Sequence, residues 1–312
     1  MVSIGSGQFP GSGFHVPDRL APKASGLPLG GQFDAPDLLA RKAGHENFPV
    51  ASHLLARESR ARLMAIYGFA RLADDLGDEA EGDRLACLDW LEAELDLAAA
   101  GRADHPVLRQ LTPVIRGLDL SLEPFRDLLE ANRMDQRVTR YRSFGDLVDY
   151  CMLSAAPVGR LVLAVFGASM PERITLSDEV CIGLQVVEHL QDVGEDARRG
   201  RIYLPAEDME RFGCTEAELL ATDSSPALRR LVAMEVSRAR SLLASAVPLA
   251  ASLRFRPRAA VVGFGAGGTA ALDSIEQAGY DVLKQHCSPH KLAFARRAFS
   301  DLVAAGAGRG RL

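Results

Sequence analysis

Helical periodicity is the sequence feature that most constrains the fold of this 312-residue chain. From Asp34 onward, apolar side chains recur every three to four residues, the spacing that places them on one face of a helix. Breakers such as Gly101, Pro106 and Pro124 separate or start the segments. The chain is therefore predicted to be all-α and to form a single helical domain. The expected helices cover residues 58–79, 83–100, 121–137, 143–167, 172–198, 225–248, 257–286 and 289–305.

The two ends of the chain lack this pattern. Residues 1–33 are rich in Gly, Pro and Ser and are predicted to be a disordered leader. The helical domain is expected to span residues 34–306. Residues 307–312 are expected to form a flexible tail.

Composition excludes several classes of protein. A net charge of −5 is not that of a general nucleic-acid binder, which carries a basic excess. Five scattered cysteines without a CxxC pair are typical of reduced thiols in a cytosolic protein. The N-terminus lacks a signal-peptide pattern. The apolar run 161–168 is too short to span a bilayer, so we expect a cytoplasmic protein with no transmembrane helix.

Two aspartate pairs stand out within the predicted helices. Asp74 and Asp78 follow an apolar run in "FARLADDLGDE", and Asp192 and Asp196 lie in "LQDVGED". Residues four apart share one face of a helix, about 6 Å apart at Cβ. The spacing alone is weak evidence, since an aspartate-rich chain contains such pairs by chance. A solvated helix face is the alternative interpretation of each pair.

The neighbours of these pairs favour a pocket. Tyr67 is expected on the same face as Asp74, with apolar residues deep in the pocket and carboxylates at its mouth. Glu188 joins Asp192 and Asp196 on the other stripe, where the carboxylates repel each other unless a cation intervenes. Mg²⁺ prefers a few carboxylates together with water and phosphate oxygens. Two such faces opposed across a bundle predict a site for a Mg²⁺-bridged diphosphate, with Mn²⁺ as the alternative ion.

Three blocks of sequence resemble the signatures of the squalene/phytoene synthase family. They cover residues 45–79, 150–160 and 190–205, and the similarity spans roughly residues 38–296. The opening "ENFPVAS" and the glutamine at 191 are most similar to the hydroxysqualene synthase branch of bacterial hopanoid biosynthesis. The resemblance implies an isoprenoid (terpenoid) synthase fold with a central cavity.

The resemblance also implies an activity. Enzymes of the branch ionise presqualene diphosphate and quench the rearranged cation with water, which gives hydroxysqualene and diphosphate. Two alternatives stay open. One is a head-to-head prenyltransferase that joins two farnesyl or geranylgeranyl diphosphates to presqualene diphosphate, squalene or phytoene. The other is a non-catalytic helical lipid-binding scaffold. Peripheral membrane contact and coupling to other squalene-pathway enzymes are further expectations.

Individual residues match the family's motifs. The resemblance assigns metal binding to Asp74, Asp78, Asp192 and Asp196, catalytic positions to Tyr67, Arg71 and Tyr150, and diphosphate-side positions to His45, Ser52 and Arg71. Arg71 would contact the diphosphate in a bidentate manner. The two tyrosines would face a carbocation. For His45 and Ser52, helix capping or simple hydrogen bonding is the interpretation that we favour.

Two positions depart from the family pattern. Glu188 and Gln191 stand where many relatives have asparagine and arginine. The lost arginine and the added carboxylate favour a substrate with a single diphosphate. We hypothesise that Glu188 or Gln191 orients the quenching water.

A G-x-G-x-x-G match at Gly263, Gly265 and Gly268 is typical of a dinucleotide-binding turn when it is read alone. Such a turn needs further strands to build a sheet, and the sequence that follows supplies none. A helix whose small residues allow close packing is the preferred interpretation. No NADPH is therefore expected, which leaves water to end the reaction.

Overall fold

The structure is a computed structural model that describes residues 56–284. Within this range the fold is all-α, as the periodicity predicts, and the β-pairing found there is an isolated bridge between Arg140 and Ile202. The elements are α2 (Arg57–Asp78), α3 (Arg84–Ala99), α4 (Pro106–Leu118), α5 (Glu123–Asp135), α6 (Phe144–Ser154), α7 (Ala156–Val165), α8 (Pro171–Gln191), α9 (Val193–Arg198), α10 (Ala206–Phe212), the 3₁₀ helix η1 (Glu216–Leu220), α11 (Pro226–Leu243), α12 (Ala246–Ser252) and α13 (Phe255–Gln277). The predicted leader, the tail and the expected helix at 289–305 lie outside the described residues.

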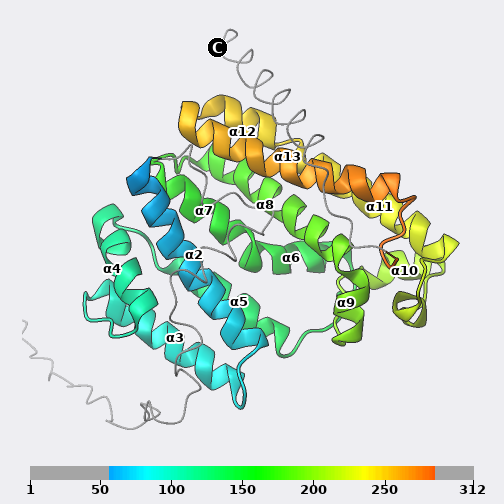
Figure 1. Ribbon diagram of the computed structural model, residues 1–312, viewed down its shortest axis with the longest axis horizontal. Coiled ribbons are helices and arrows are strands. Elements are labelled where there is room, and N and C mark those ends of the chain that lie inside the picture. The colour runs from blue at the N-terminus through cyan, green and yellow to red at the C-terminus, as the bar shows by residue number, and fades with distance from the viewer. Residues whose placement is uncertain (1–55, 285–312) are drawn as a thin grey trace, which may run out of the picture.

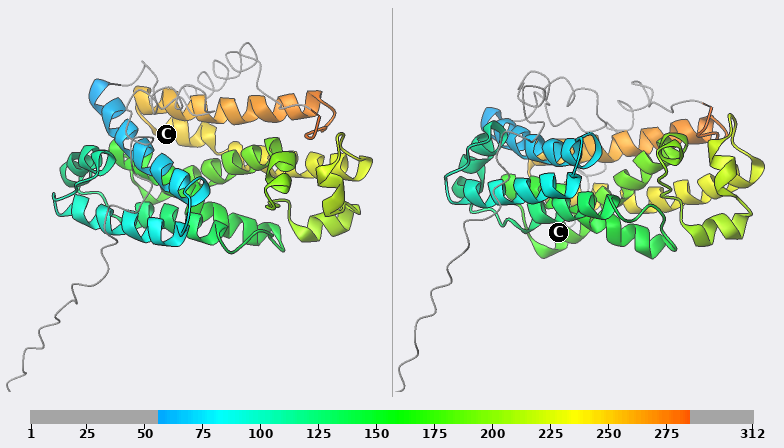
Figure 2. Two further views of the ribbon diagram at one scale, coloured as in Figure 1. Left: turned by 60° about the horizontal axis from the view of Figure 1, so that its bottom comes forward. Right: turned by 90° about the horizontal axis from the view of Figure 1, so that it is seen from below.

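The helices form a bundle with α6, α7 and α8 at its centre. Helices α2 to α5 lie on one side of this centre and α9, α10 and α11 extend toward the other (Figure 1). Helix α13 runs along one face of the molecule together with α12, and it contacts α8 and α11 (Figure 2). The bundle thus places α2 and α8, which carry the aspartate motifs, on either side of its interior.

Two apolar cores hold this arrangement. One joins α2 to α5 with α7, where the ring of Phe69 meets the edge of Phe125 at 5.1 Å between centroids. The other joins α5 to α8 with the later helices around residues such as Leu184 and Leu231. Burial of a large apolar side chain contributes about 1.5–3 kcal/mol. The apolar faces of α2 and α8 are thus fixed in two cores, and this sets the direction of their polar faces.

Several predicted boundaries were wrong. The helix expected at 143–167 is divided at Ala155, and Pro157 lies in the first turn of the next helix. The helix expected at 172–198 is divided at Asp192. Helices α4 and α10 were not predicted. In α4, Pro106 starts the helix and Pro113 lies inside it. Because proline usually interrupts a helix, the regular apolar face of this segment was not recognised as helical.

The glycine motif lies inside α13, as the packing interpretation predicts. A Cβ atom at Gly265 would come within 2.6 Å of the Cβ of Ala246, and one at Gly268 within 2.7 Å of Leu184. These glycines therefore allow α13 to approach α12 and α8 closely.

Residues 144–165 are long and apolar enough to cross a membrane by length and composition, which the short apolar run at 161–168 did not indicate. This stretch is α6 followed by α7, and half of the apolar window is buried inside the bundle. Such burial is typical of core helices.

Candidate active site

A polar cavity of about 260 Å³ lies between α2, α5, α6 and α8. Its wall combines six carboxyl groups, two arginines and several aromatic and amide side chains. The lining residues are Asp74, Asp78, Leu128, Ala131, Asn132, Asp135, Tyr150, Ser154, Gln185, Glu188, His189, Asp192, Asp196, Arg199, Arg201 and Tyr203. Both aspartate motifs therefore face one cavity, as the sequence predicts.

The first motif is held by close contact between α2 and α5. Gly77 has no side chain, and a Cβ there would overlap the side chain of Asn132, at 2.3 Å from its amide oxygen. Because α5 comes this near, the Asn132 amide nitrogen donates to Asp74 at 3.2 Å. The same nitrogen donates to the carbonyl of Leu128 at 3.1 Å, which fixes its orientation.

The second motif lies at a break between two helices. Asp192 ends α8 with non-helical backbone angles, and α9 begins at the next residue. The hydrogen bond from the Asp196 amide to the Asp192 carbonyl is still made, at 2.8 Å. The two carboxylates thus stay near each other on the cavity wall although no single straight helix carries them.

The loop after α9 supplies a cation to the first motif. Ile202 donates its amide to the carbonyl of Thr139 at 2.9 Å, and this contact fixes the loop against the segment that follows α5. Arg201 then forms an ion pair with Asp78 at 2.8 Å. The loop brings Tyr203 to the same cavity.

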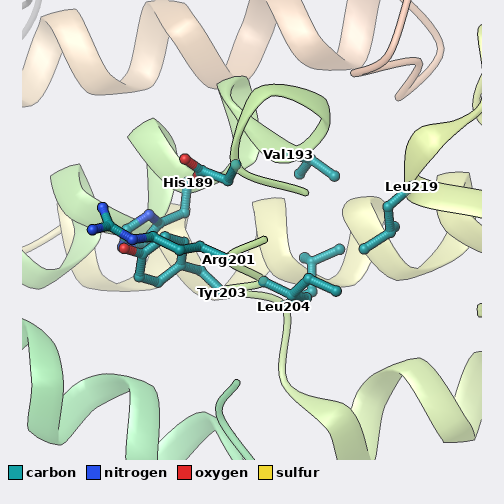
Figure 3. Close-up of a pocket in the computed structure, with 8 residues that line it drawn as sticks. His189, Val193, Arg201, Tyr203, Leu204 and Leu219 are labelled. Atoms are coloured by element: carbon teal, nitrogen blue, oxygen red, sulfur yellow. The ribbon is translucent and has the colours of Figure 1, made fainter. Parts of the chain in front are cut away.

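Aromatic side chains form the wall beside this ion pair. The rings of His189 and Tyr203 stack at 3.8 Å between centroids, and Figure 3 shows them next to Arg201. Tyr150 lies 5.7 Å from Tyr203 between centroids. Burial lowers the pKa of His189 to about 3, so its imidazole is neutral. Asp135 accepts hydrogen bonds from both tyrosine hydroxyls, at 2.8 Å from Tyr150 and 3.2 Å from Tyr203.

The carboxylates of the cavity carry more negative charge than the protein neutralises. Burial, opposed by the Asn132 hydrogen bond, raises the pKa of Asp74 to about 7, although the side chain is exposed to the cavity. Burial and the neighbouring Asp192 raise the pKa of Asp196 to about 7. Bringing a cation into the cavity would therefore stabilise the ionised form of both groups.

The donor set fits Mg²⁺ that is shared with a ligand. Among residues 56–284, no three Asp, Glu, His or Cys side chains converge closely enough to hold an ion by themselves. Mg²⁺ usually takes one or two carboxylates and keeps water and phosphate oxygens for its other positions. Opposed aspartate pairs, in which the pKa values of Asp74 and Asp196 are raised, suit an ion bound in this way, so the four aspartates remain its proposed ligands.

The structure does not bring every predicted residue to the cavity. Arg71 turns to Asp75 at 2.7 Å and to Glu79 at 3.6 Å, and neither it nor Tyr67 lines the cavity. Gln191 is buried and is also absent from the wall. Tyr150 and Glu188 line it as expected. His45 and Ser52 lie outside the described residues.

The expected apolar chamber is not what this cavity provides. Leu128 and Ala131 are the aliphatic side chains among its lining residues, and its volume is slightly below the ~300 Å³ of small ligand pockets. The cavity has the character of a head-group site, with room for a diphosphate and its counterions. Carboxylates make up six of its sixteen lining residues.

Sequence reasoning missed several residues of the wall. Arg201 and Tyr203 lie in the third signature block, directly after the second aspartate motif, where a signal was present. Asn132 and Asp135 lie on the polar face of a predicted helix, and no motif marks them. His189 was missed because a lone histidine next to an apolar stripe usually belongs to a core.

An all-helical bundle with two aspartate motifs opposed across a central cavity defines the class of isoprenoid synthase folds. Residues 41–295 match the squalene/phytoene synthase family, and the chain belongs to that family. It is 42% identical over 206 residues to the hydroxysqualene synthase of Zymomonas mobilis, which covers 64% of this chain and 69% of that protein. It is 39% identical over 214 residues to the hydroxysqualene synthase of Rhodopseudomonas palustris, covering 67% of this chain and 72% of that protein.

Solved structures agree with this fold. The crystal structure of squalene synthase HpnC from Alicyclobacillus acidocaldarius is 41% identical, with a TM-score of 0.73 over 82% of this chain and 95% of that chain. A dehydrosqualene synthase with a bound ligand has a TM-score of 0.77 at 24% identity over 89% of this chain and 95% of that chain. The second likeness shows the fold alone.

Proposed function

We propose that this protein is a Mg²⁺-dependent isoprenoid synthase that converts presqualene diphosphate to hydroxysqualene and diphosphate. The observation that carries the proposal is the pair of aspartate motifs facing one cavity that also contains Arg199 and Arg201. The hydroxysqualene synthases of Zymomonas mobilis and Rhodopseudomonas palustris support the choice of reaction.

The residues of the cavity suit the departure of a diphosphate. Arg201 and Arg199 would donate charge-assisted hydrogen bonds to the leaving oxygens, on which negative charge develops. Asp74, Asp78, Asp192 and Asp196 would hold Mg²⁺, which supplies Lewis-acid stabilisation of the leaving diphosphate.

The aromatic wall suits the cation that remains. Tyr150 and Tyr203 present electron-rich rings, and the neutral imidazole of His189 adds no positive charge that would repel a carbocation. Glu188 lies on the same wall and remains a candidate to orient water, whereas Gln191 is buried and does not line the cavity. The reaction ends with water, so no NADPH is required.

A condensing enzyme is the second candidate. The phytoene synthase of Arthrospira platensis is 34% identical over 259 residues, covering 77% of this chain and 82% of that protein. Such an enzyme joins two prenyl diphosphates, so its site must accommodate two anionic groups. Six carboxylates against two arginines in the cavity favour one diphosphate over two.

Two incubations separate these activities. Purified protein with Mg²⁺ and without nicotinamide is supplied with presqualene diphosphate in one tube and with farnesyl diphosphate in the other. Hydroxysqualene from the first tube alone, with ¹⁸O incorporated from labelled water, is the expected result. Presqualene diphosphate, squalene or phytoene-type product from prenyl diphosphates would support the condensing enzyme instead. No turnover in either tube would support a lipid-binding scaffold.

A further inference from the structure

We propose that Asp135 is the positioning residue that directs water onto the cation, by holding the hydroxyl groups of Tyr150 and Tyr203. This inference rests on the proposed function and concerns the step that makes the product an alcohol. Asp135 is the last residue of α5 and lines the same cavity as both tyrosines.

Both hydroxyl protons are committed to one carboxylate. The Tyr150 hydroxyl donates to one Asp135 oxygen at 2.8 Å, and the Tyr203 hydroxyl donates to the other at 3.2 Å. A tyrosine hydroxyl has a single proton and can also accept hydrogen bonds. The two hydroxyl groups also interact with each other. With both protons pointing at Asp135, the hydroxyl oxygens act toward the cavity as acceptors.

The rings cannot easily turn away from this arrangement. Tyr203 stacks on His189 at 3.8 Å between centroids with an interplanar angle of 12° (Figure 3). Tyr150 packs against Tyr203 and also against Tyr141, at 5.4 Å between centroids. Tyr150 and Tyr203 are both buried. The two oxygens are therefore held at fixed points of the wall.

Fixed acceptors orient an attacking water. A water that donates a hydrogen bond to the Tyr150 oxygen keeps its lone pairs free to point at a cation within the cavity. If the tyrosine hydroxyls instead donated hydrogen bonds to this water, the lone pairs of the water would point at the hydroxyls and away from the cation. The arrangement thus favours addition of water over loss of a proton from the cation.

The same contacts account for the proton released in this step. The water oxygen forms a bond to the cationic carbon, and one of its O–H bonds breaks. That proton passes to the Tyr150 oxygen while the original Tyr150 proton passes to Asp135. The product is a neutral alcohol, both tyrosines remain neutral, and Asp135 is protonated until it passes the proton to solvent.

Burial supports this order of events. The pKa of Tyr150 is raised well above its ordinary value, chiefly by burial, so a free phenolate is unfavourable and the two transfers have to occur together. Burial also raises the pKa of Asp135, opposed by the hydrogen bond from Tyr150. A carboxylate with a raised pKa is a better proton acceptor.

The test is the ratio of alcohol to hydrocarbon formed from presqualene diphosphate, measured by gas chromatography for Asp135→Asn and for Tyr150→Phe. The hydrocarbon is the product of proton loss from the same cation. A general base contributes about 10²–10⁴-fold to the step it serves, so we expect the ratio to fall by at least about tenfold in both variants. Asp149→Asn is the matched control, because Asp149 is exposed on α6 beside Tyr150, and its ratio should equal that of the wild type.

Failure of this inference differs from failure of the proposed function. Wild-type protein that makes no hydroxysqualene from presqualene diphosphate overturns the function and, with it, this inference. Wild-type protein that makes hydroxysqualene, with unchanged ratios in both variants, overturns the role of Asp135 alone. A merely structural role would lower the melting temperature and the total product but leave the ratio unchanged. If Asp135→Asn does not fold, Tyr150→Phe and Tyr203→Phe decide, because phenylalanine keeps the ring packing.

Discussion

Arg201 forms an ion pair with Asp78 at 2.8 Å, so the loop behind the second aspartate motif provides a cation to the first. The arginine is largely buried, whereas Asp78 stays open to the cavity. Burial acts to lower the pKa of Arg201, but nearby Asp78, Tyr203 and Asp135 outweigh it and raise that pKa above its ordinary value, so the guanidinium remains charged. The Arg201 side chain therefore pairs with Asp78, a proposed metal ligand, and also lines the cavity in which the diphosphate would bind.

We expect Arg201→Gln to change two affinities in opposite directions. Without the guanidinium, Asp78 is free for a divalent ion, so Mg²⁺ alone should bind more tightly. Pyrophosphate in the presence of Mg²⁺ should bind more weakly by about 10–150-fold, the equivalent of one charged hydrogen bond of about 1.5–3 kcal/mol. Isothermal titration calorimetry measures both affinities.

Arg126→Gln serves as the control for this experiment. Arg126 forms an exposed ion pair with Asp96 at 2.7 Å, away from the cavity wall. Its substitution should alter neither affinity. Weaker binding of Mg²⁺ alone in Arg201→Gln would show that the arginine supports the metal site by structure and does not compete for Asp78.

Asp196→Asn is expected to make the metal-free protein more stable at alkaline pH. The pKa of Asp196 is about 7 in the folded protein, above the ordinary value of 3.8, so the protonated form favours folding. This contribution is fully present below about pH 4 and is lost as the pH rises through 7. The wild-type melting temperature should therefore fall between pH 5 and 8, and Asp196→Asn should raise it at pH 8 by about 2–4 °C, the shift for about 1 kcal/mol.

Thermal melts with and without Mg²⁺ check this prediction. Mg²⁺ should stabilise the wild type at pH 8 and should stabilise Asp196→Asn less, because one proposed ligand is missing. Asp104→Asn, at an exposed position, provides the control for the loss of one surface charge. A wild-type melting temperature that rises from pH 5 to 8 in metal-free buffer would contradict the burial of these carboxylates.

The sequence predicted those parts of the site that periodicity determines. Asp74 and Asp78 follow from the face of one regular helix, and burial of Phe69 and Leu72 on its other side fixes their direction. The break at Asp192 was not visible, because the apolar periodicity of the predicted helix 172–198 continues across it.

Residues from other elements escaped prediction because they depend on which helices become neighbours. Asn132 reaches Asp74 only because Gly77 allows α5 to approach α2, and a single sequence does not reveal such a pairing. Asp135 likewise belongs to the site through its hydrogen bonds with Tyr150 of α6 and Tyr203 of the loop after α9, and the sequence does not show that these elements meet. The family resemblance placed Arg71 at the diphosphate, whereas in this structure its side chain pairs with Asp75.

Glu188 and Gln191 are expected to behave differently when they are substituted. Glu188 lines the cavity, so Glu188→Gln should alter the distribution of products from presqualene diphosphate. Gln191 is buried and does not line the cavity, so Gln191→Ala should lower the melting temperature but leave the distribution unchanged. Unchanged products in Glu188→Gln would remove the support for its role in orienting water.

The glycine motif of α13 gives a test of close helix packing. In Gly265→Ala the new methyl group would lie 2.6 Å from the methyl of Ala246, and neither group can rotate away. Such overpacking costs about 1–3 kcal/mol. Gly117→Ala in α4 is the matched control, because its new methyl meets no atom within 4 Å and the change favours the helix by about 1 kcal/mol. Urea unfolding should therefore give free-energy changes of opposite sign for the two variants. A stabilised Gly265→Ala would show that α13 does not need this glycine in order to pack against α12, and would reopen the question of what the motif does.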